Sequence, residues 1–254
     1  MLMLHHGDTS VASAKVRLLL AEKRLEFESR LYELRRGEHK NPQYLSINPH
    51  GVVPTLIHNG VVVRESNVIL EYLEDAFPEP PMMPPFAAMK APVRLMLREV
   101  DHIHDACSIL SSSLKLVALR MAPKREWELF LSRVADPAKR DRQRQLLEFG
   151  FDAPAIWAAI HRYRRIVHLA DAMLRDDRWL SGSSNGLADC AALPYFHRAD
   201  SLGLKELWTW SPLVGTWLER MKDRPSFEMA ILRWTGTSSP YRACAELQAI
   251  VSRG

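Results

Sequence analysis

Hydroxyl side chains near the N-terminus of the sequence could take part in sulfur chemistry. Thr9, Ser10 and Ser13 lie where a short apolar run gives way to a helical pattern. A hydroxyl at a helix start could donate a hydrogen bond to a thiolate, and the free N–H groups and dipole of the helix would stabilise the same charge. The alternative is that these side chains only cap the helix, a common use of serine and threonine.

The pair Val53-Pro54 is a second candidate, because it opens an apolar run typical of a strand. Proline cannot donate a hydrogen bond to a neighbouring strand, so its position is unusual. A cis peptide bond before Pro54 would turn the N–H and C=O of Val53 outward, toward an extended, peptide-like ligand. An ordinary trans proline at a strand start is the alternative, and the pair alone favours it because cis bonds are uncommon.

Glu65 and Ser66 form a third candidate, just ahead of a helical pattern. Ser66 at a helix N-terminus would lie beside free N–H groups that bind carboxylate or phosphate. Glu65 could accept an ammonium group. Together they suit the zwitterionic end of an α-amino acid, and the alternative is a plain helix cap next to a surface glutamate.

The elements that position these residues alternate between strand and helix up to residue 77. The apolar run 2–6 indicates a strand, 13–24 a helix, and the alternating run 25–31 a half-exposed strand. This β-α-β order predicts a parallel strand pair with a crossover helix. Asn59-Gly60, between two apolar runs, predicts a type I′ hairpin, because both residues tolerate positive φ.

We expect Ser66 to cap the helix that follows. The buried face of that helix is predicted from the spacing of its apolar residues. This face comprises Val68, Ile69, Tyr72, Leu73 and Ala76.

Residues 78–85 hold five prolines in eight positions, which excludes helix and strand and indicates a stiff linker. Everything after it is helix-like. In one segment the apolar residues recur at steps of four and three and predict a single buried face, comprising Ile156, Ile160, Tyr163, Val167, Ala170 and Leu174. The highly charged stretch near 120–155 is interpreted as an exposed helix-loop-helix. We therefore predict an α/β domain at 1–78, a proline-rich linker at 79–90 and an all-helical domain at 91–254.

Composition restricts the possible functions. The 254 residues are 47% hydrophobic and 25% charged, which is ordinary for a globular protein, and the formal net charge of +4 is weak for a nucleic-acid binder. No apolar run is long enough to span a bilayer, and the N-terminus does not resemble a secretory signal, so we expect a cytoplasmic protein. Cys107, Cys190 and Cys244 are interpreted as reduced thiols, because no spacing fits a metal site or a disulfide exchanger.

Taken together, these features resemble the glutathione S-transferases, which have a thioredoxin-like N-terminal domain and an all-helical C-terminal domain. The resemblance covers nearly the whole chain. It is most specific in KVR at 15–17, in GEHKNPQYLSINPHGVVPTL at 37–56, and in Glu65-Ser66. GLADCAAL at 186–193 resembles a helix start of that family. The stretch 120–155 resembles, more weakly, the bacterial β-etherase branch.

The resemblance implies roles for particular residues, with glutathione as the co-substrate. Ser10 matches the catalytic serine, although Val11 follows it where proline is frequent, so Ser13 remains a substitute. Val53, ahead of a cis Pro54, matches the residue whose backbone pairs with the glutathione cysteine. Glu65 and Ser66 match the clamp for the γ-glutamyl end. His39, Lys40 and His50 match positions that can reach the glycine carboxylate.

Two departures and two eliminations refine the resemblance. Gly186 stands where serine or threonine is usual, so the cap side chain is lost, although Asp189 can still bond back to the cap N–H. No tyrosine precedes Tyr32 and no cysteine lies near Ser10, which argues against the tyrosine-type and cysteine-type branches.

The resemblance implies an enzyme that adds glutathione to, or uses it to cleave, a small hydrophobic electrophile such as an aryl ether. It also implies a role in detoxification and a homodimer, with neither nucleic acid nor membrane as partner. On the helical side, His104 and Ser108, with Cys107 and Ser111, lie on one side of a long helix and are candidates to contact the electrophile. The alternative is that they form a buried contact with another helix. A non-catalytic binding or regulatory protein of the same fold is the alternative.

Overall fold

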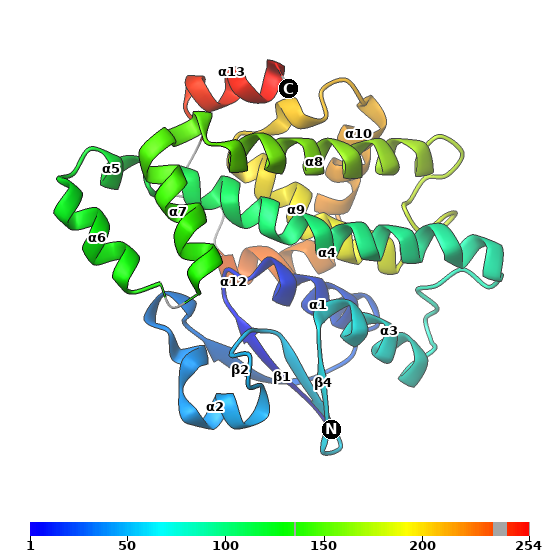
Figure 1. The fold of residues 1–254 in the computed structure, drawn as a ribbon. Helices are drawn as coiled ribbons and strands as arrows, with labels where there is room; N and C mark the ends of the chain where they lie inside the picture. Colours follow the sequence, from blue (N-terminus) through cyan, green and yellow to red (C-terminus); the bar gives the residue numbers. More distant parts are fainter. Residues whose placement is uncertain (135, 236–242, 254) are drawn as a thin grey trace.

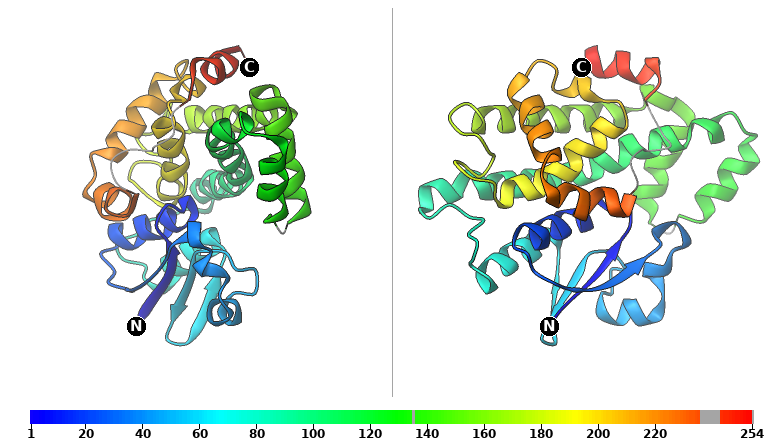
Figure 2. Two further views of the ribbon diagram at one scale, coloured as in Figure 1. Left: turned by 90° about the vertical axis from the view of Figure 1, so that its left-hand side faces the viewer. Right: turned by 180° about the vertical axis from the view of Figure 1, so that it is seen from behind.

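The computed structural model describes residues 1–134, 136–235 and 243–253. A sheet-containing N-terminal domain packs beneath a larger helical domain (Figures 1 and 2). This arrangement confirms the predicted fold class. The elements of the N-terminal domain are β1 (Leu2–Gly7), α1 (Val11–Glu22), β2 (Glu28–Tyr32), η1 (Leu34–Arg36), η2 (Glu38–Lys40), α2 (Pro42–Ile47), β3 (Thr55–His58), β4 (Val61–Arg64) and α3 (Ser66–Ala76).

The sheet has the strand order β2-β1-β3-β4, with β1 parallel to β2 and antiparallel to β3. The predicted parallel pair joined by a crossover helix is therefore confirmed. The second strand begins only at Glu28, three residues after the start of the alternating pattern. Leu25 and Phe27 pack against the core from the connecting loop instead.

The β3–β4 hairpin is built as its turn residues predict. His58 pairs with Val61, and Asn59 and Gly60 have φ values of 49° and 87°, as a type I′ turn requires. Ahead of β3, the Val53–Pro54 peptide bond is cis. The cis form is what the family resemblance implies, whereas the residue pair alone favoured trans.

The start of α3 differs from the expected arrangement. Glu65 occupies the cap position, with a positive φ of 64°, and Ser66 is the first helical residue. The expectation that Ser66 caps this helix was therefore wrong. The buried face was also only partly predicted, because Leu70 is buried with Ile69 and Leu73 while Val68 and Ala76 are exposed.

The linker lacks helix and strand from 77 to 86, and residues 87–90 already form the first turn of α4. Within the described residues, no helix is both long and apolar enough to cross a membrane. The helical domain contains α4 (Ala87–Lys115), α5 (Val117–Arg120), α6 (Lys124–Ser132), α7 (Pro137–Phe149), η3 (Gly150–Asp152), α8 (Pro154–Met173), α9 (Leu187–Ser201), η4 (Lys205–Leu207), α10 (Pro212–Lys222), α11 (Pro225–Phe227), the π-helical turn η5 (Glu228–Leu232), α12 (Arg233–Thr235) and α13 (Ala245–Arg253).

The core of the helical domain forms where α4 packs on α8 and α9. All six residues of the predicted face are buried, five of them on α8 and the sixth, Leu174, at its C-terminal cap. Helix α9 also packs on α1, so α1 is covered by the sheet on one side and by the helical domain on the other (Figure 1). Helices α6 and α7 project at one side of the domain and are mostly exposed, as expected for the charged stretch (Figure 2).

The start of α9 shows why glycine replaces the usual cap residue. The Asp189 carboxylate accepts from the Gly186 N–H at 3.0 Å, which confirms the expected return bond. A Cβ on Gly186 would lie 2.3 Å from the backbone oxygen of Met82, which also accepts from the Leu187 N–H at 2.8 Å. The close approach of the linker backbone therefore excludes a side chain at this position.

A buried histidine lies beneath the interface between the two domains. His6 Nε2 lies 2.7 Å from Ser29 Oγ, and His6 Nδ1 accepts from Arg17 Nη1 at 3.1 Å. Burial, and next the charge of Arg17, lower the pKa of His6 to about 3. The imidazole is therefore neutral in the folded protein at neutral pH.

We expect His6 to destabilise the protein as the pH falls below about 6.5. In the unfolded chain the imidazole of His6 binds a proton near its ordinary pKa, whereas in the folded protein it binds one only near pH 3. Between these two pH values protonation stabilises the unfolded chain, so the free energy of unfolding decreases as the pH falls. Between pH 7 and pH 5 this group should remove about 2 kcal/mol of unfolding free energy. Urea unfolding at both pH values measures the loss, which should be smaller in His6→Gln.

The matched control is His161→Gln, which replaces an exposed histidine of α8 and should keep the wild-type pH dependence. A nuclear magnetic resonance titration that gave His6 an ordinary pKa would contradict the expectation, even if His6→Gln failed to fold.

Candidate active site between the two domains

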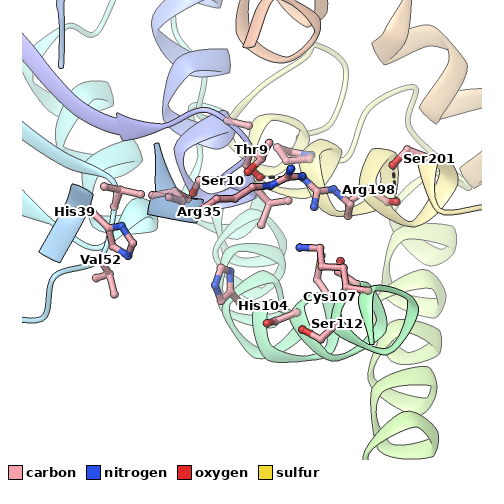
Figure 3. A pocket seen from close by; sticks show the side chains of 18 of the residues that line it. Thr9, Ser10, Arg35, His39, Val52, His104, Cys107, Ser112, Arg198 and Ser201 are labelled. Carbon is pink, nitrogen blue, oxygen red and sulfur yellow. Dashed lines mark hydrogen bonds between the residues drawn. The ribbon is translucent and has the colours of Figure 1, made fainter. Parts of the chain in front are cut away.

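A cavity of about 600 Å³ opens between the N-terminal domain and the helical domain. The loop before α1, the region around η1 and η2, and the segment before the cis proline form its N-terminal wall. Helices α4 and α9 form the opposite wall, and Lys139 of α7 also lines the cavity. Figure 3 shows Thr9 and Ser10 on one side and His104, Cys107 and Ser112 on the other.

Ser10 lines this cavity at the N-terminus of α1. It is the cap residue, and its Oγ accepts from the Ser13 N–H at 3.1 Å. Among the described residues its hydroxyl hydrogen has no acceptor, so it can be donated to a group in the cavity. The predicted roles of cap and donor are thus compatible in one side chain.

Ser13, the predicted substitute, lies elsewhere. Its side chain is fully buried, and its Oγ accepts from the Gly7 N–H at 3.2 Å. Ser13 is not among the residues that line the cavity, whereas Thr9 is. The structure therefore brings Ser10, not Ser13, to the cavity wall.

Val53 presents free backbone groups to the cavity. Within the described part of the chain, neither its N–H nor its C=O takes part in a hydrogen bond, as a peptide-like ligand would require. The preceding residue is held from behind, because Asn48 Nδ2 donates to the Val52 oxygen at 2.9 Å. Pro54 follows Val53 but is buried and does not itself line the cavity.

His39 and Lys40 line the same wall, and His50 does not. His39 Nδ1 is buried and has no hydrogen-bond partner among the described residues, so it is another group that a ligand could satisfy. Burial, and next the charges of Lys40 and Lys139, lower the pKa of His39. Lys40 Nζ donates to the His50 oxygen at 3.2 Å, so His50 contributes to this wall through Lys40.

Glu65 and Ser66 lie beside the cavity, outside the set of lining residues. Burial, and next the charge of Lys15, lower the pKa of the cavity residue His104, and Glu65 is one of the carboxylates that oppose this decrease. A ligand that reaches from Val53 to Glu65 would therefore extend beyond the enclosed volume.

Lys15 and Asn67 fix the start of α3 relative to Ser10. Lys15 is fully buried, and its Nζ donates to Asn67 Oδ1 at 2.7 Å, while Asn67 Nδ2 donates to the Leu97 oxygen of α4 at 2.6 Å. Burial lowers the pKa of Lys15 to about 8, and Asp101, 3.7 Å away, opposes that effect. The buried lysine thus joins three helices behind the candidate site.

On the helical wall, His104, Cys107, Ser108 and Ser111 all line the cavity, whereas the sequence had left open whether they face a cleft or a buried helix contact. His104 Nδ1 lies 3.0 Å from the Tyr195 hydroxyl. Burial raises the pKa of the Cys107 thiol, so it remains protonated and unsuited to act as a nucleophile. Cys107 is the one cysteine among the described lining residues, so a nucleophilic sulfur in this cavity would come from a ligand.

Sequence reasoning missed the basic side chains of this cavity. Lys115 continues the helical face of His104, Ser108 and Ser111, and this spacing could have identified it. For the others the sequence carries no such signal, because they come from distant segments. They are Arg35, Lys139 and Arg198.

The residues present fit a peptide thiol. Such a ligand would find unpaired main-chain groups at Val53, a hydroxyl donor and helix N-terminus at Ser10, and basic side chains for its carboxylates. Within the described residues there is no cluster of three or more His, Cys, Asp or Glu that could hold a metal ion.

Comparisons with known proteins agree with this geometry. Residues 4–81 match the model of the glutathione S-transferase N-terminal domain. Glutathione S-transferase 1 of Dianthus caryophyllus is 40% identical over 83 residues, which are 33% of this chain and 38% of that protein. FtsZ-localized protein A of Caulobacter vibrioides is 29% identical, and the match covers 92% of each chain.

Among solved structures, a beta-etherase from Sphingobium sp. strain SYK-6 has a TM-score of 0.73 at 26% identity, covering 90% of this chain and 98% of that one. The family match includes the domain that contributes Ser10 and Val53, and the structural similarity extends through the helical domain. Glutathione is the co-substrate of the enzymes of this family. Residues 4–81 therefore form a glutathione S-transferase N-terminal domain, and the whole chain resembles solved structures of that family in fold.

Proposed function

We propose that the protein is a glutathione transferase that conjugates, or uses glutathione to cleave, a small hydrophobic electrophile. The observation that carries this proposal is the meeting of Ser10, at the N-terminus of α1, and the unpaired main chain of Val53 in one cavity. Glu65 and Ser66 would hold the γ-glutamyl end, and His39 and Lys40 the glycine carboxylate, with His50 supporting Lys40. The proposed setting is detoxification in the cytoplasm.

Ser10 would act on the sulfur by donating its hydroxyl hydrogen, with the free N–H groups of α1 beside it. A free thiol has a pKa of about 8.5, so about 3% is ionised at pH 7. A decrease of about two units would raise the ionised fraction to roughly three-quarters. The intrinsic nucleophilicity would fall by about six- to tenfold, so the net gain is only a few-fold.

Positioning must therefore supply most of the rate enhancement. The bound thiol supplies the nucleophile, and the helical wall with His104 and Ser108 would hold the electrophile against it. Whether the product is a conjugate or a cleaved ether depends on the leaving group that this wall accepts. The structural likeness to a beta-etherase supports ether cleavage as one form of the reaction.

Replacing the Ser10 hydroxyl should shift the pH dependence of the reaction. In Ser10→Ala the sulfur loses a donor that favours its charged form, so the acidic limb of kcat/KM should move up by about one pH unit or more. The rate near pH 7 should fall only a few-fold, for the reason given above. Rates with 1-chloro-2,4-dinitrobenzene between pH 5.5 and 9 measure both effects, and Ser10→Thr should restore the profile.

Ser13→Ala is the matched control, because this hydroxyl is buried and does not line the cavity. If the pH dependence of kcat/KM were normal in Ser10→Ala but shifted in Ser13→Ala, the proposed donor to the sulfur would be Ser13 and not Ser10. Thermal unfolding of each variant separates this effect from loss of the helix cap, which costs about 1 kcal/mol.

We also propose a homodimer. Exposed apolar side chains on β4, on α3 and at the start of α4 support a self-complementary surface. They are Val61, Val62, Val68, Phe86, Met89 and Leu95.

Light scattering at micromolar concentration should give twice the mass of one chain. Val68→Asp should shift the protein toward monomer, since it places a charge in the proposed interface. Leu213→Asp, at another exposed apolar position, on α10, should not. A wild-type monomer at this concentration would disprove the dimer.

A non-catalytic binding or regulatory protein is the second candidate. The observation that favours it is the whole-chain match to a relative whose name refers to localisation with FtsZ and to no reaction. Under the transferase proposal, the protein should be retained on immobilised glutathione and should turn over at least one of a panel of halo-aromatics, epoxides and β-aryl ethers. Retention without any turnover would support the second candidate instead.

A further inference from the structure

Basic side chains line the cavity, and no acidic side chain of the described residues lies among them. Of the lining residues that the structure describes, five are lysine or arginine and none is aspartate or glutamate. The basic residues are Arg35, Lys40, Lys115, Lys139 and Arg198. Its histidines add little charge, because burial lowers the pKa of His39 and His104, and that of His197 to about 4.

The basic side chains come from both domains and meet inside the cavity. Arg35 follows β2, whereas Lys115 belongs to α4, Lys139 to α7 and Arg198 to α9. Arg35 and Arg198 reach into the same central part of the cavity (Figure 3). Burial lowers the pKa of Lys115, and the charges of Arg198 and Arg35 lower it further, which indicates that these cations repel one another.

No carboxylate of the described residues pairs with Arg35, Lys139 or Arg198. Arg198 Nη2 instead donates to the Thr9 oxygen at 2.9 Å, which holds its guanidinium next to Ser10. Elsewhere in the same domain such cations are paired, for example Arg224 with Glu22 at 2.6 Å. Like charges gathered without a counter-charge are unfavourable until an anion binds between them.

Glutathione can account for only part of this charge. Its glycine carboxylate would meet Lys40 and Arg35 on the N-terminal wall, beside Val52 and Val53. Lys115, Lys139 and Arg198 then remain on the helical wall, where the electrophile must lie. Apolar residues such as Pro194 and Leu202 line the cavity beside them.

We propose that the helical wall binds an electrophile that carries a carboxylate on an apolar body, with Arg198, Lys115 and Lys139 as the residues that select the anion. This inference rests on the proposed transferase function and narrows its substrate class. The guanidinium of Arg198 can pair with both carboxylate oxygens, and the lysines contribute point charges. The electrophilic carbon would then lie within reach of the sulfur at Ser10.

Binding of an unreactive pair of ligands tests the inference without relying on turnover. We suggest calorimetric titration with 3-nitrobenzoate and with 3-nitrobenzamide, which are equal in size and differ in charge. S-methylglutathione should be present, so that the tripeptide occupies its own groove. The benzoate should bind about tenfold or more tightly than the amide, as expected for hydrogen bonds to a charged group.

Variants assign the preference to the helical wall. In Lys115→Gln and in Arg198→Gln the ratio of the two affinities should fall toward one, whereas Arg198→Lys should keep part of it. Lys205→Gln, at an exposed site outside the cavity, should leave the ratio unchanged. Equal binding of benzoate and amide by the wild-type protein would overturn the inference, as would an unchanged ratio in both glutamine variants.

Turnover separates this inference from the proposed function. Rates with 4-chloro-3-nitrobenzoate and 4-chloro-3-nitrobenzamide, each divided by its uncatalysed rate, should favour the benzoate by a similar factor. Turnover of the amide without any preference for the benzoate would overturn the anion selectivity and support the transferase. Selective benzoate binding with no turnover and no retention on glutathione would overturn the transferase and support the anion site.

Discussion

The geometry of the site depends on the hydrogen bonds that the buried guanidinium of Arg17 makes. Its nitrogens donate to the Gly7 oxygen at 2.9 Å, to the Asp8 oxygen at 3.3 Å and to the Ala230 oxygen at 2.8 Å. One side chain of α1 thus holds the end of β1, the loop that leads to Ser10, and the turn η5 of the helical domain. A buried cation is tolerated only when its donors are satisfied, so the position of each segment depends on the others.

The same interface explains why the cavity is both fixed and charged. Arg198 of α9 joins the two domains in the same way as Arg17. Its side chain donates to the Thr9 oxygen, which lies further along the same loop. Because Arg198 also lines the cavity, a residue that joins the domains contributes charge where a substrate would lie. Alignment of the thiol and selection of its partner therefore depend on one set of interdomain contacts.

The sequence predicts best the features that arise from local chemistry. The positive φ values at Asn59 and Gly60 follow from the turn type, and the buried face of α8 follows from regular spacing of large apolar residues. In α3, apolar residues occur on more than one side, so spacing could not show that Leu70 is buried and Val68 exposed.

In the candidate site, too, the features that depend on neighbouring residues were predictable and those that depend on tertiary packing were not. The positions of Ser10 and Val53 were predictable, because neighbouring residues in the sequence mark the start of a helix and the start of a strand after a proline. The burial of Ser13 away from the cavity wall and the presence of Arg198 in that wall were not, since both depend on how the end of β1 packs against distant parts of the chain.

The charged stretch around α6 and α7 shows how a solvated surface can still influence the site. These helices are anchored by few buried side chains, namely Leu131 on α6 and Leu146 and Leu147 on α7. Most of their charged residues face solvent, yet Lys139 lines the cavity. Burial lowers the pKa of both His39 and Lys115, and the charge of Lys139 adds to that decrease after larger effects from other cations. Charge in this stretch can therefore change at little cost to the core while it alters the field that a bound anion experiences.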